Sequence, residues 1–145
     1  MKLPSQQYSG APENEFAMMT IAGMMGMNVP EIQLVDLDAV SGLPQGIGEL
    51  QGQALAISRF DRMPDGPVHI EDFAQLFGVF PDHKYDKGNY RMIGHVLGIE
   101  TGAADVAEFI RRLVFSTLIG NGDMHLKNWS IIYPDRRTPA RSPRL

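Results

Sequence analysis

The clearest hydrophobic pattern in the chain runs from Ala103 to Ile119 and predicts an amphipathic helix. The positions that follow helical spacing are Val106, Phe109, Ile110, Leu113, Val114, Thr117 and Leu118. The opposite side of such a helix carries Asp105, Glu108, Arg111 and Arg112. We therefore expect the first set to pack against a core and the second to face solvent.

Residues 13–26 predict another helix, near the start of the chain. Glu13 and Glu15 place carboxylates where the helix dipole favours them, Asn14 is a cap candidate, and Gly26 suits the C-terminal end. This segment and its end are rich in methionine: Met18, Met19, Met24, Met25 and Met27. We interpret the methionines as adaptable core packing, with a peptide-binding surface as the alternative.

The middle of the chain predicts two shorter helices around a polar loop. Residues 70–78 begin with acidic side chains and should bury Phe73, Leu76 and Phe77. Residues 79–88 are polar and predict a loop. Residues 90–97 predict a helix that Gly98 ends.

Short alternating segments predict strands between these helices. Residues 30–35 and 53–61 have this pattern, and the Gly-rich residues 41–52 between them predict a loop or a hairpin. Met63-Pro64-Asp65-Gly66 predicts a turn, because proline presets φ and glycine accepts a positive φ. The apolar residues 129–133 are interpreted as a further strand.

The C-terminal tail, residues 133–145, contains three prolines and four arginines and cannot form a regular element by itself. Its position after a strand suggests a chain that stops before its next element. The alternative is a short basic disordered arm. Strands and helices in this order predict an α+β fold: a small sheet with one helix, followed by a mostly helical region that carries residues 120–128.

Composition narrows the class of protein. The 145 residues are 43% hydrophobic and 21% charged, which suits one globular domain or part of a larger one. A formal net charge of −4 argues against direct binding to nucleic acid by bulk electrostatics. Without cysteine, disulfides and thiolate zinc sites are excluded.

The sequence also gives no signal for export or membrane insertion. The first seven residues lack the apolar core of a secretory signal. The most apolar stretch, residues 16–29, is interrupted by Gly23 and Gly26 and is too short to cross a bilayer. We therefore expect a cytoplasmic protein with no membrane partner.

The segment Gly120-Asn121-Gly122-Asp123-Met124-His125-Leu126-Lys127-Asn128 concentrates polar chemistry after the predicted helix. Asp123 and Asn128 have the spacing found in kinase catalytic loops, where the carboxylate orients the attacking hydroxyl and the amide oxygen binds magnesium. The bland alternative is a helix cap at Asn121-Gly122 followed by a solvated loop. A second alternative is a metal site at Asp123 and His125. The i, i+4 or H-x-H spacing that is typical of metal ligands does not occur among the other histidines, which are His69, His83 and His95.

Several motifs occur together along almost the whole chain. In order, they are Lys2-Leu3-Pro4, Glu13-Asn14-Glu15, Ser58-Arg59-Phe60-Asp61-Arg62, Glu71-Asp72-Phe73, Lys84-Tyr85-Asp86 and residues 120–128. With these motifs, the sequence closely resembles the HipA family of bacterial serine/threonine kinases, which are the toxin halves of toxin–antitoxin pairs. The resemblance implies a partial protein-kinase-like fold, with residues 1–62 in the nucleotide-binding lobe and hinge and residues 63–145 in the helical lobe.

The resemblance also implies roles for individual residues. Asp123 is similar to the catalytic aspartate, Asn128 to the magnesium-binding asparagine and Lys2 to a lysine that contacts the ATP phosphates. Glu15 resembles the helix partner of that lysine. The remaining candidates are Ser58, Arg59 and Phe60, similar to the hinge that meets adenine, and His125 and Lys127, which would steady phosphate charge.

Without the resemblance these residues have ordinary explanations. Lys2 would be a solvated charge near the chain start, and Glu15 an acid that complements a helix dipole. Residues 58–60 would be an edge strand that runs into a turn, with Phe60 in the core.

The chain also departs from the family pattern. The family's further N-terminal subdomain and phosphate-binding loop have no counterpart before Lys2, and Asp135 does not match the family's second metal-binding aspartate. We expect an incomplete catalytic domain that is weakly active or inactive on its own. The implied function is an ATP- and magnesium-dependent kinase with a protein serine substrate and a helix-turn-helix antitoxin as partner. The alternative is a non-catalytic remnant that only binds an antitoxin.

Overall fold

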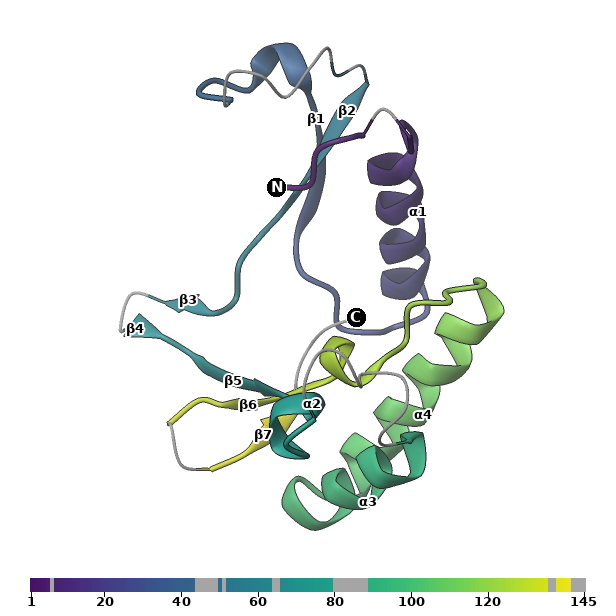
Figure 1. Ribbon diagram of the computed structural model, residues 1–145, viewed down its shortest axis with the longest axis vertical. Coiled ribbons are helices and arrows are strands. Elements are labelled where there is room, and N and C mark those ends of the chain that lie inside the picture. Colours follow the sequence, from purple (N-terminus) through teal and green to yellow (C-terminus); the bar gives the residue numbers. More distant parts are fainter. Residues whose placement is uncertain are drawn as a thin grey trace. The chain divides into compact units, whose positions relative to one another are not determined.

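The computed structural model describes residues 1–5, 7–43, 50, 52–63, 66–79, 89–135 and 138–141 (Figure 1). The predicted polar loop after Val79 and the Lys84-Tyr85-Asp86 motif lie outside the described residues. The chain forms two compact units, Met1–Arg59 and Phe60–Leu145.

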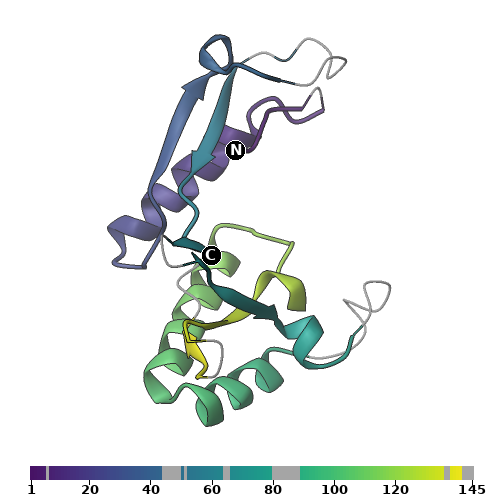
Figure 2. The same ribbon diagram turned by 90° about the vertical axis from the view of Figure 1, so that its left-hand side faces the viewer.

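The first unit is one helix packed on a small sheet. Helix α1 (Ala11–Met24) lies along the antiparallel pair β1 (Ile32–Asp36) and β2 (Gln53–Ile57), and Figure 2 shows the helix behind the two strands. A short 3₁₀ helix, Leu37–Ala39, follows β1. The core of the unit contains the fully buried Ala54 and Leu55 of β2 and the α1 residues Met19 and Ala22. Residues 58–61, which the alternating pattern included in the second strand, lie beyond the end of β2.

Helix α1 begins two residues before the predicted start. Its N-cap is Gly10, with no side-chain cap, and Pro12 lies in the first turn, where a missing N–H costs nothing. The prediction that Asn14 caps the helix is therefore wrong. Gly26 has a φ of 76° just beyond the end of the helix and donates to the carbonyl of Gly23, so the predicted glycine stop is confirmed.

The methionines of this region divide into two groups. Met19 and Met27 are buried, as core packing predicts. Met24 is 83% exposed and Met25 52% exposed, so for these two the prediction is wrong. Met24 lies about 200° around the helix from the buried Ala22, which turns it away from the sheet.

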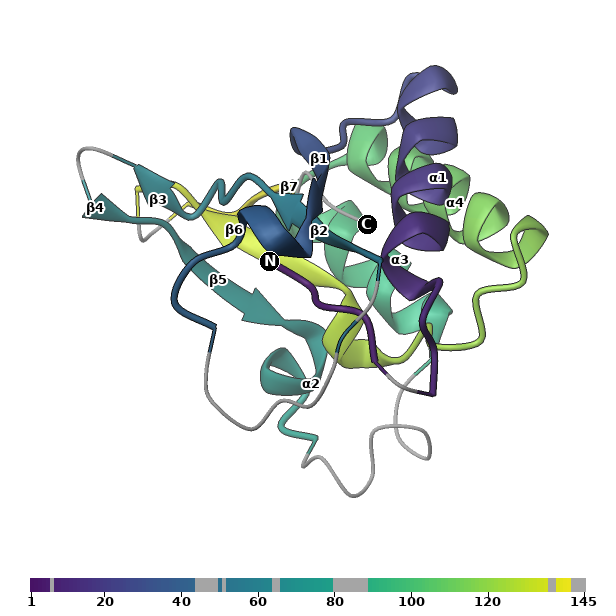
Figure 3. The ribbon, with the colours of Figure 1, turned by 90° about the horizontal axis from the view of Figure 1, so that it is seen from above.

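In its described residues, the second unit combines two small sheets with helices that follow β5. The hairpin β3 (Arg62–Met63) and β4 (Gly66–Pro67) leads into β5 (His69–Asp72). Strand β5 pairs antiparallel with β6 (Ser130–Tyr133), as can be followed in Figure 3, and β6 pairs with β7 (Ala140–Arg141). Between β5 and β6 the chain forms α2 (Phe73–Leu76), α3 (Tyr90–Glu100), α4 (Ala103–Leu118) and a 3₁₀ turn at Leu126–Asn128.

One apolar cluster joins the helices of this unit to the 3₁₀ turn and β6. Its buried members are Phe73, Ala74, Ile93, Leu97, Phe109, Leu126, Trp129 and Ile131. The rings of Phe109 and Trp129 meet edge to face, with their centroids 4.8 Å apart. The cluster therefore fixes α3 and α4 against the segment that carries Leu126 and Trp129.

Two predicted helix boundaries in this unit are wrong for identifiable reasons. Residues 70–72 belong to β5 rather than to a helix, because they pair with β6. The side chain of Asp72 then caps α2 by accepting from the backbone N–H of Gln75. Helix α3 continues through Gly98, where an added Cβ would lie 3.6 Å from the side chain of Val106. The chain turns instead at Gly102, which has a φ of 99°.

The predicted orientation of α4 is also wrong in part. Phe109 is buried as expected, but Ile110 and Val114 are each 52% exposed and Leu118 is 77% exposed, while Glu108 and Arg112 are buried. The charges can be buried because they pair. Arg112 Nε donates to Glu108 Oε1 at 2.8 Å, and Arg111 donates to the other carboxylate oxygen.

The fold is α+β, as predicted: small antiparallel sheets with packed helices. In the C-terminal tail, Ala140 and Arg141 form β7, which pairs with β6. Residues 136–137 and 142–145 of the tail lie outside the described residues, so the prediction for the tail as a whole stays a prediction. Within the described ranges, none of the helices has the length and apolar character needed to cross a membrane.

Candidate active site

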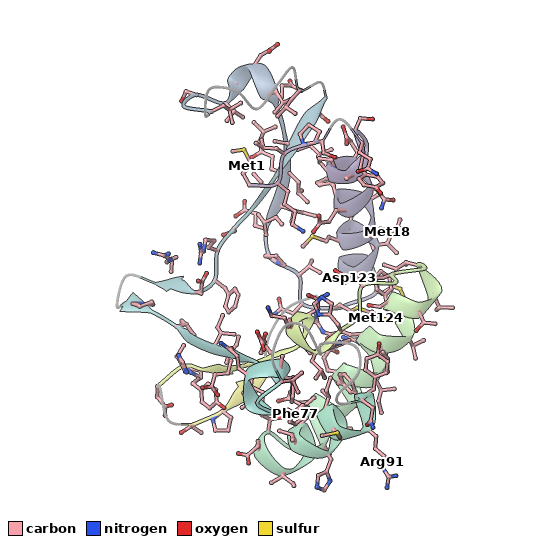
Figure 4. All side chains as sticks on the ribbon, viewed as in Figure 1. Met1, Met18, Phe77, Arg91, Asp123 and Met124 are labelled. Carbon is pink, nitrogen blue, oxygen red and sulfur yellow. The ribbon has the colours of Figure 1, made fainter. Side chains whose placement is uncertain are left out.

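The segment from Gly120 to Asn128 is a loop held at both ends. Helix α4 ends at Leu118, and Gly120, two residues later, has a φ of 72°. The left-handed residue after the helix is therefore Gly120, not Asn121 or Gly122, where the alternative interpretation placed the cap. The N–H of Asn121 donates to the carbonyl of Ser116 at 2.9 Å. At the other end, Leu126 and Trp129 are buried in the apolar cluster. Figure 4 shows Asp123 and Met124 on the segment between these two anchors.

Hydrogen bonds inside the loop fix the backbone around Asp123. The N–H of Asp123 donates to Asn121 Oδ1 at 3.0 Å. The amide nitrogen of Asn128 donates to the carbonyl oxygen of Asp123, five residues earlier. Asn121 and Asn128 thus close the loop on either side of the candidate catalytic residue, which a freely solvated loop would not require.

His125 holds the carboxylate of Asp123. Its Nδ1 accepts from the N–H of Lys127 at 3.2 Å, so the proton of a neutral ring resides on Nε2. That Nε2 lies 3.2 Å from Asp123 Oδ1. The His125 side chain is only 8% exposed, whereas that of Asp123 is 68% exposed. A buried imidazole therefore orients a carboxylate that remains accessible to a reactant.

Asn128 has the chemistry of a magnesium ligand in this arrangement. Because its amide nitrogen binds the Asp123 carbonyl, its amide oxygen is the atom left for a cation, and oxygen is the ligand type that Mg²⁺ prefers. Magnesium sites commonly take one or two protein oxygens and complete the shell with water and phosphate. Across the described part of the chain, no group of three or more His, Asp or Glu residues is placed to hold a metal ion.

Tyr90 is a member of the site that the sequence analysis missed. Its hydroxyl donates to the carbonyl oxygen of Met124 at 2.8 Å, across 34 residues of sequence. No spacing rule links positions so far apart. The only available signal was the place of Tyr90 at the start of a predicted helix.

The first unit contains the predicted lysine–glutamate contact. Lys2 Nζ lies 2.5 Å from Glu15 Oε1, so this contact is confirmed, although its role toward ATP stays a prediction. Lys2 is placed by the backbone: its N–H donates to the carbonyl of Leu55 at 2.8 Å, and it accepts from Leu55 at 2.9 Å. Lys2 and Glu15 therefore connect α1 to the edge of β2 that faces away from β1.

The candidate hinge residues follow β2. The N–H of Ser58 donates to the carbonyl of Glu31 at 2.9 Å, Ser58 and Arg59 are exposed, and Phe60 is half-buried. The first compact unit ends at Arg59, directly after Ser58, and the second begins at Phe60. Lys127 is exposed beside the candidate catalytic residues. Asp135 is a turn residue, since both of its carboxylate oxygens accept from Thr138.

Comparison with known proteins decides the family. The HipA-like C-terminal domain family matches residues 1–143. The chain belongs to this family. The resemblance stated from the motifs is confirmed.

Curated relatives carry kinase names. The chain is 88% identical over 143 residues to "Putative kinase Y4dM" of Sinorhizobium fredii (strain NBRC 101917 / NGR234), covering 99% of this chain and 35% of that protein. It is 30% identical over 148 residues to "Putative kinase Y4mE" of the same strain, covering 94% of this chain and 32% of the relative. A "Putative kinase" of Haemophilus influenzae is 30% identical, with 99% of this chain and 42% of that protein covered.

A solved structure supports the fold. The match is to the Shewanella oneidensis MR-1 toxin–antitoxin complex of HipA, HipB and operator DNA, with a TM-score of 0.61 and 24% identity. It covers 88% of this chain and 32% of that chain. The chain thus has a HipA-like fold and spans about a third of the length of Y4dM, Y4mE and this neighbour.

Proposed function

We propose that this chain is part of an ATP- and magnesium-dependent protein serine/threonine kinase of the HipA toxin type. The observation that carries the proposal is the arrangement of the 120–128 loop, in which His125 orients an accessible Asp123 and Asn128 keeps an amide oxygen available. The kinase names of the relatives agree with this chemistry.

In the proposed reaction the hydroxyl oxygen of a protein serine forms a bond to the γ-phosphorus of ATP, the bond from that phosphorus to the bridging oxygen breaks, and ADP leaves. Asp123 binds the serine hydroxyl and accepts its proton. His125 keeps the carboxylate in place through its Nε2–H. Asn128 and the ATP phosphates would hold the magnesium ion, which neutralises charge on the transferred group. Lys127, next to Asn128, would place a cation near the phosphates.

The first unit would bind the nucleotide. Lys2 would contact the ATP phosphates. The carboxylate of Glu15 holds the ammonium group of Lys2 in position. The Lys2 side chain is 58% exposed, so a phosphate can reach it without displacing a packed residue. The backbone of residues 58–60 would meet the adenine ring, as the family resemblance implies.

The family resemblance suggests the partner, and the solved neighbour supports it, because its title describes HipA assembled with HipB and operator DNA. We infer a helix-turn-helix antitoxin as the partner of this chain within the whole protein. The expectation that this chain itself makes no direct contact with nucleic acid stays a prediction. A non-catalytic module that only binds such an antitoxin is the second candidate, because the chain spans a third of its relatives' length.

A chimera distinguishes the two functions. Residues 1–143 of this chain would replace the matching segment of Y4dM, with which they are 88% identical. With radiolabelled ATP and magnesium, we expect label on serine residues, either of the chimera itself or of proteins in a bacterial lysate. If Y4dM transfers phosphate and the chimera does not, while the chimera still binds the antitoxin, the non-catalytic function is correct. If neither protein transfers phosphate, the kinase proposal is wrong for both.

A further inference from the structure

The hydrogen bond from Tyr90 reaches the candidate catalytic loop from another element. The contacts described above between Asn121, Asp123, His125 and Asn128 join residues of the loop to one another. Tyr90 instead lies on α3, and its hydroxyl donates to the carbonyl of Met124, the residue after Asp123. This bond therefore fixes the loop relative to a helix.

Tyr90 stands on a firmly placed helix end. It is the first residue of α3, and the side chain of the preceding Asn89 caps that helix by accepting from the N–H of Met92 at 3.0 Å. One turn further along α3, Ile93 is fully buried in the apolar cluster. The start of α3 is thereby tied to the core, and the Tyr90 hydroxyl has a defined position.

The carbonyl that accepts from Tyr90 belongs to a peptide group whose orientation affects the contact between His125 and Asp123. The peptide group between Met124 and His125 is one of the two peptide groups that link Asp123 to His125 along the chain. A rotation of this peptide would move His125 Nε2 relative to Asp123 Oδ1, which are now 3.2 Å apart. Catalytic groups lose rate steeply when they are misplaced by as little as ~1 Å.

We propose that Tyr90 is a positioning residue for the 120–128 loop: its hydroxyl fixes the Met124 carbonyl and so preserves the contact between Asp123 and His125. The consequence for phosphate transfer rests on the proposed kinase function. An exposed hydrogen bond competes with water and adds little to global stability. Loss of the hydroxyl therefore changes the local order of the loop and leaves the unfolding transition where it was.

The structural part of the proposal is tested on this chain by Tyr90→Phe, which removes one oxygen atom. The matched control is Tyr8→Phe, because Tyr8 is a 64% exposed tyrosine of the other unit. Backbone amide spectra should show shifts at residues 121–128 and at the start of α3 in Tyr90→Phe only, with an unchanged unfolding midpoint. Unchanged loop signals, or shifts spread over the whole unit, would overturn the proposal.

The functional part is tested by placing both variants in the Y4dM chimera. Tyr90→Phe should lower kcat on the order of tenfold and leave the KM for ATP unchanged, whereas Tyr8→Phe should match the parent. Equal kcat in Tyr90→Phe and the parent chimera would refute the positioning role while the kinase function stands. An inactive parent would count against the kinase function instead, and the amide spectra alone then decide whether Tyr90 fixes the loop.

Discussion

At the scale of single residues, the contact between His125 and Asp123 distinguishes an organised loop from a solvated one. An exposed carboxylate ordinarily samples many orientations. The carboxylate of Asp123 is instead held by the imidazole Nε2 of His125, whose Nδ1 accepts a hydrogen bond from the Lys127 N–H. The side chain of Asn128 closes the backbone of the same segment. Orientation by such supporting contacts is a general requirement of a catalytic base.

Substitution of His125 tests this support directly. In the Y4dM chimera, His125→Ala removes the donor to Asp123 and should lower kcat on the order of tenfold. His125→Gln keeps an amide N–H at about the place of Nε2 and should retain most of the rate. The kcat of both variants is measured at saturating ATP. Their unfolding midpoints are recorded as well, because they show whether a lower rate comes from a loss of folding or from a misoriented Asp123. Equal rates for the Ala variant and the parent would show that His125 does not orient the carboxylate.

Individual residues of the candidate site could be predicted from the sequence only where they belong to a motif. The Lys2–Glu15 contact and the residues of the 120–128 loop followed from motifs whose members are close in sequence or recur in the family. The hydrogen bond from Tyr90 to Met124 depends on how α3 packs beside the loop, and nothing in the sequence near either residue encodes it. The tautomer of His125 likewise depends on a backbone N–H that only the folded loop presents.

At the scale of elements, α4 is the instructive case. Helical spacing correctly predicted where α4 lies, but it could not decide which side faces the core. The apolar residues cover a wide arc, and the core takes the edge with Phe109, together with the paired Glu108 and Arg112. Helical spacing alone cannot predict that an ion pair between Glu108 and Arg112 will be buried.

Two substitutions in α4 distinguish the observed face from the predicted one. Leu118→Lys should change the free energy of unfolding by no more than about 0.5 kcal/mol, because Leu118 is largely exposed. Glu108→Gln leaves the charge of buried Arg112 without its carboxylate and should cost about 3 kcal/mol or more. Urea unfolding of this chain measures both. The reverse order of the two effects would restore the face predicted from the sequence.

The other elements show the same limit of local pattern. The acids before Phe73 look like the first turn of a helix, yet residues 70–72 form a strand because β6 is available to pair with them. Gly98 looks like a helix stop, yet it is interior to α3, where Val106 of the next helix comes close. In both cases a partner distant in sequence overrides the local signal.

At the scale of the whole molecule, the sequence predicted an α+β fold and the family because the motifs recur in order along almost the entire chain. Residues 1–143 match the HipA-like C-terminal domain, and the chain spans about a third of the length of Y4dM and Y4mE. We propose kinase activity for a protein of the length of these relatives, and we expect residues 1–145 by themselves to transfer phosphate weakly or not at all.

The central claim is that Asp123 performs the chemistry of phosphate transfer. The direct test is the rate of serine phosphorylation by the Y4dM chimera with and without Asp123→Asn, a change that keeps the size of the side chain and removes its basicity. We expect kcat to fall on the order of 10²-fold or more, with the KM for ATP and the unfolding midpoint unchanged. An Asp123→Asn chimera that transfers phosphate as fast as its parent would contradict the account.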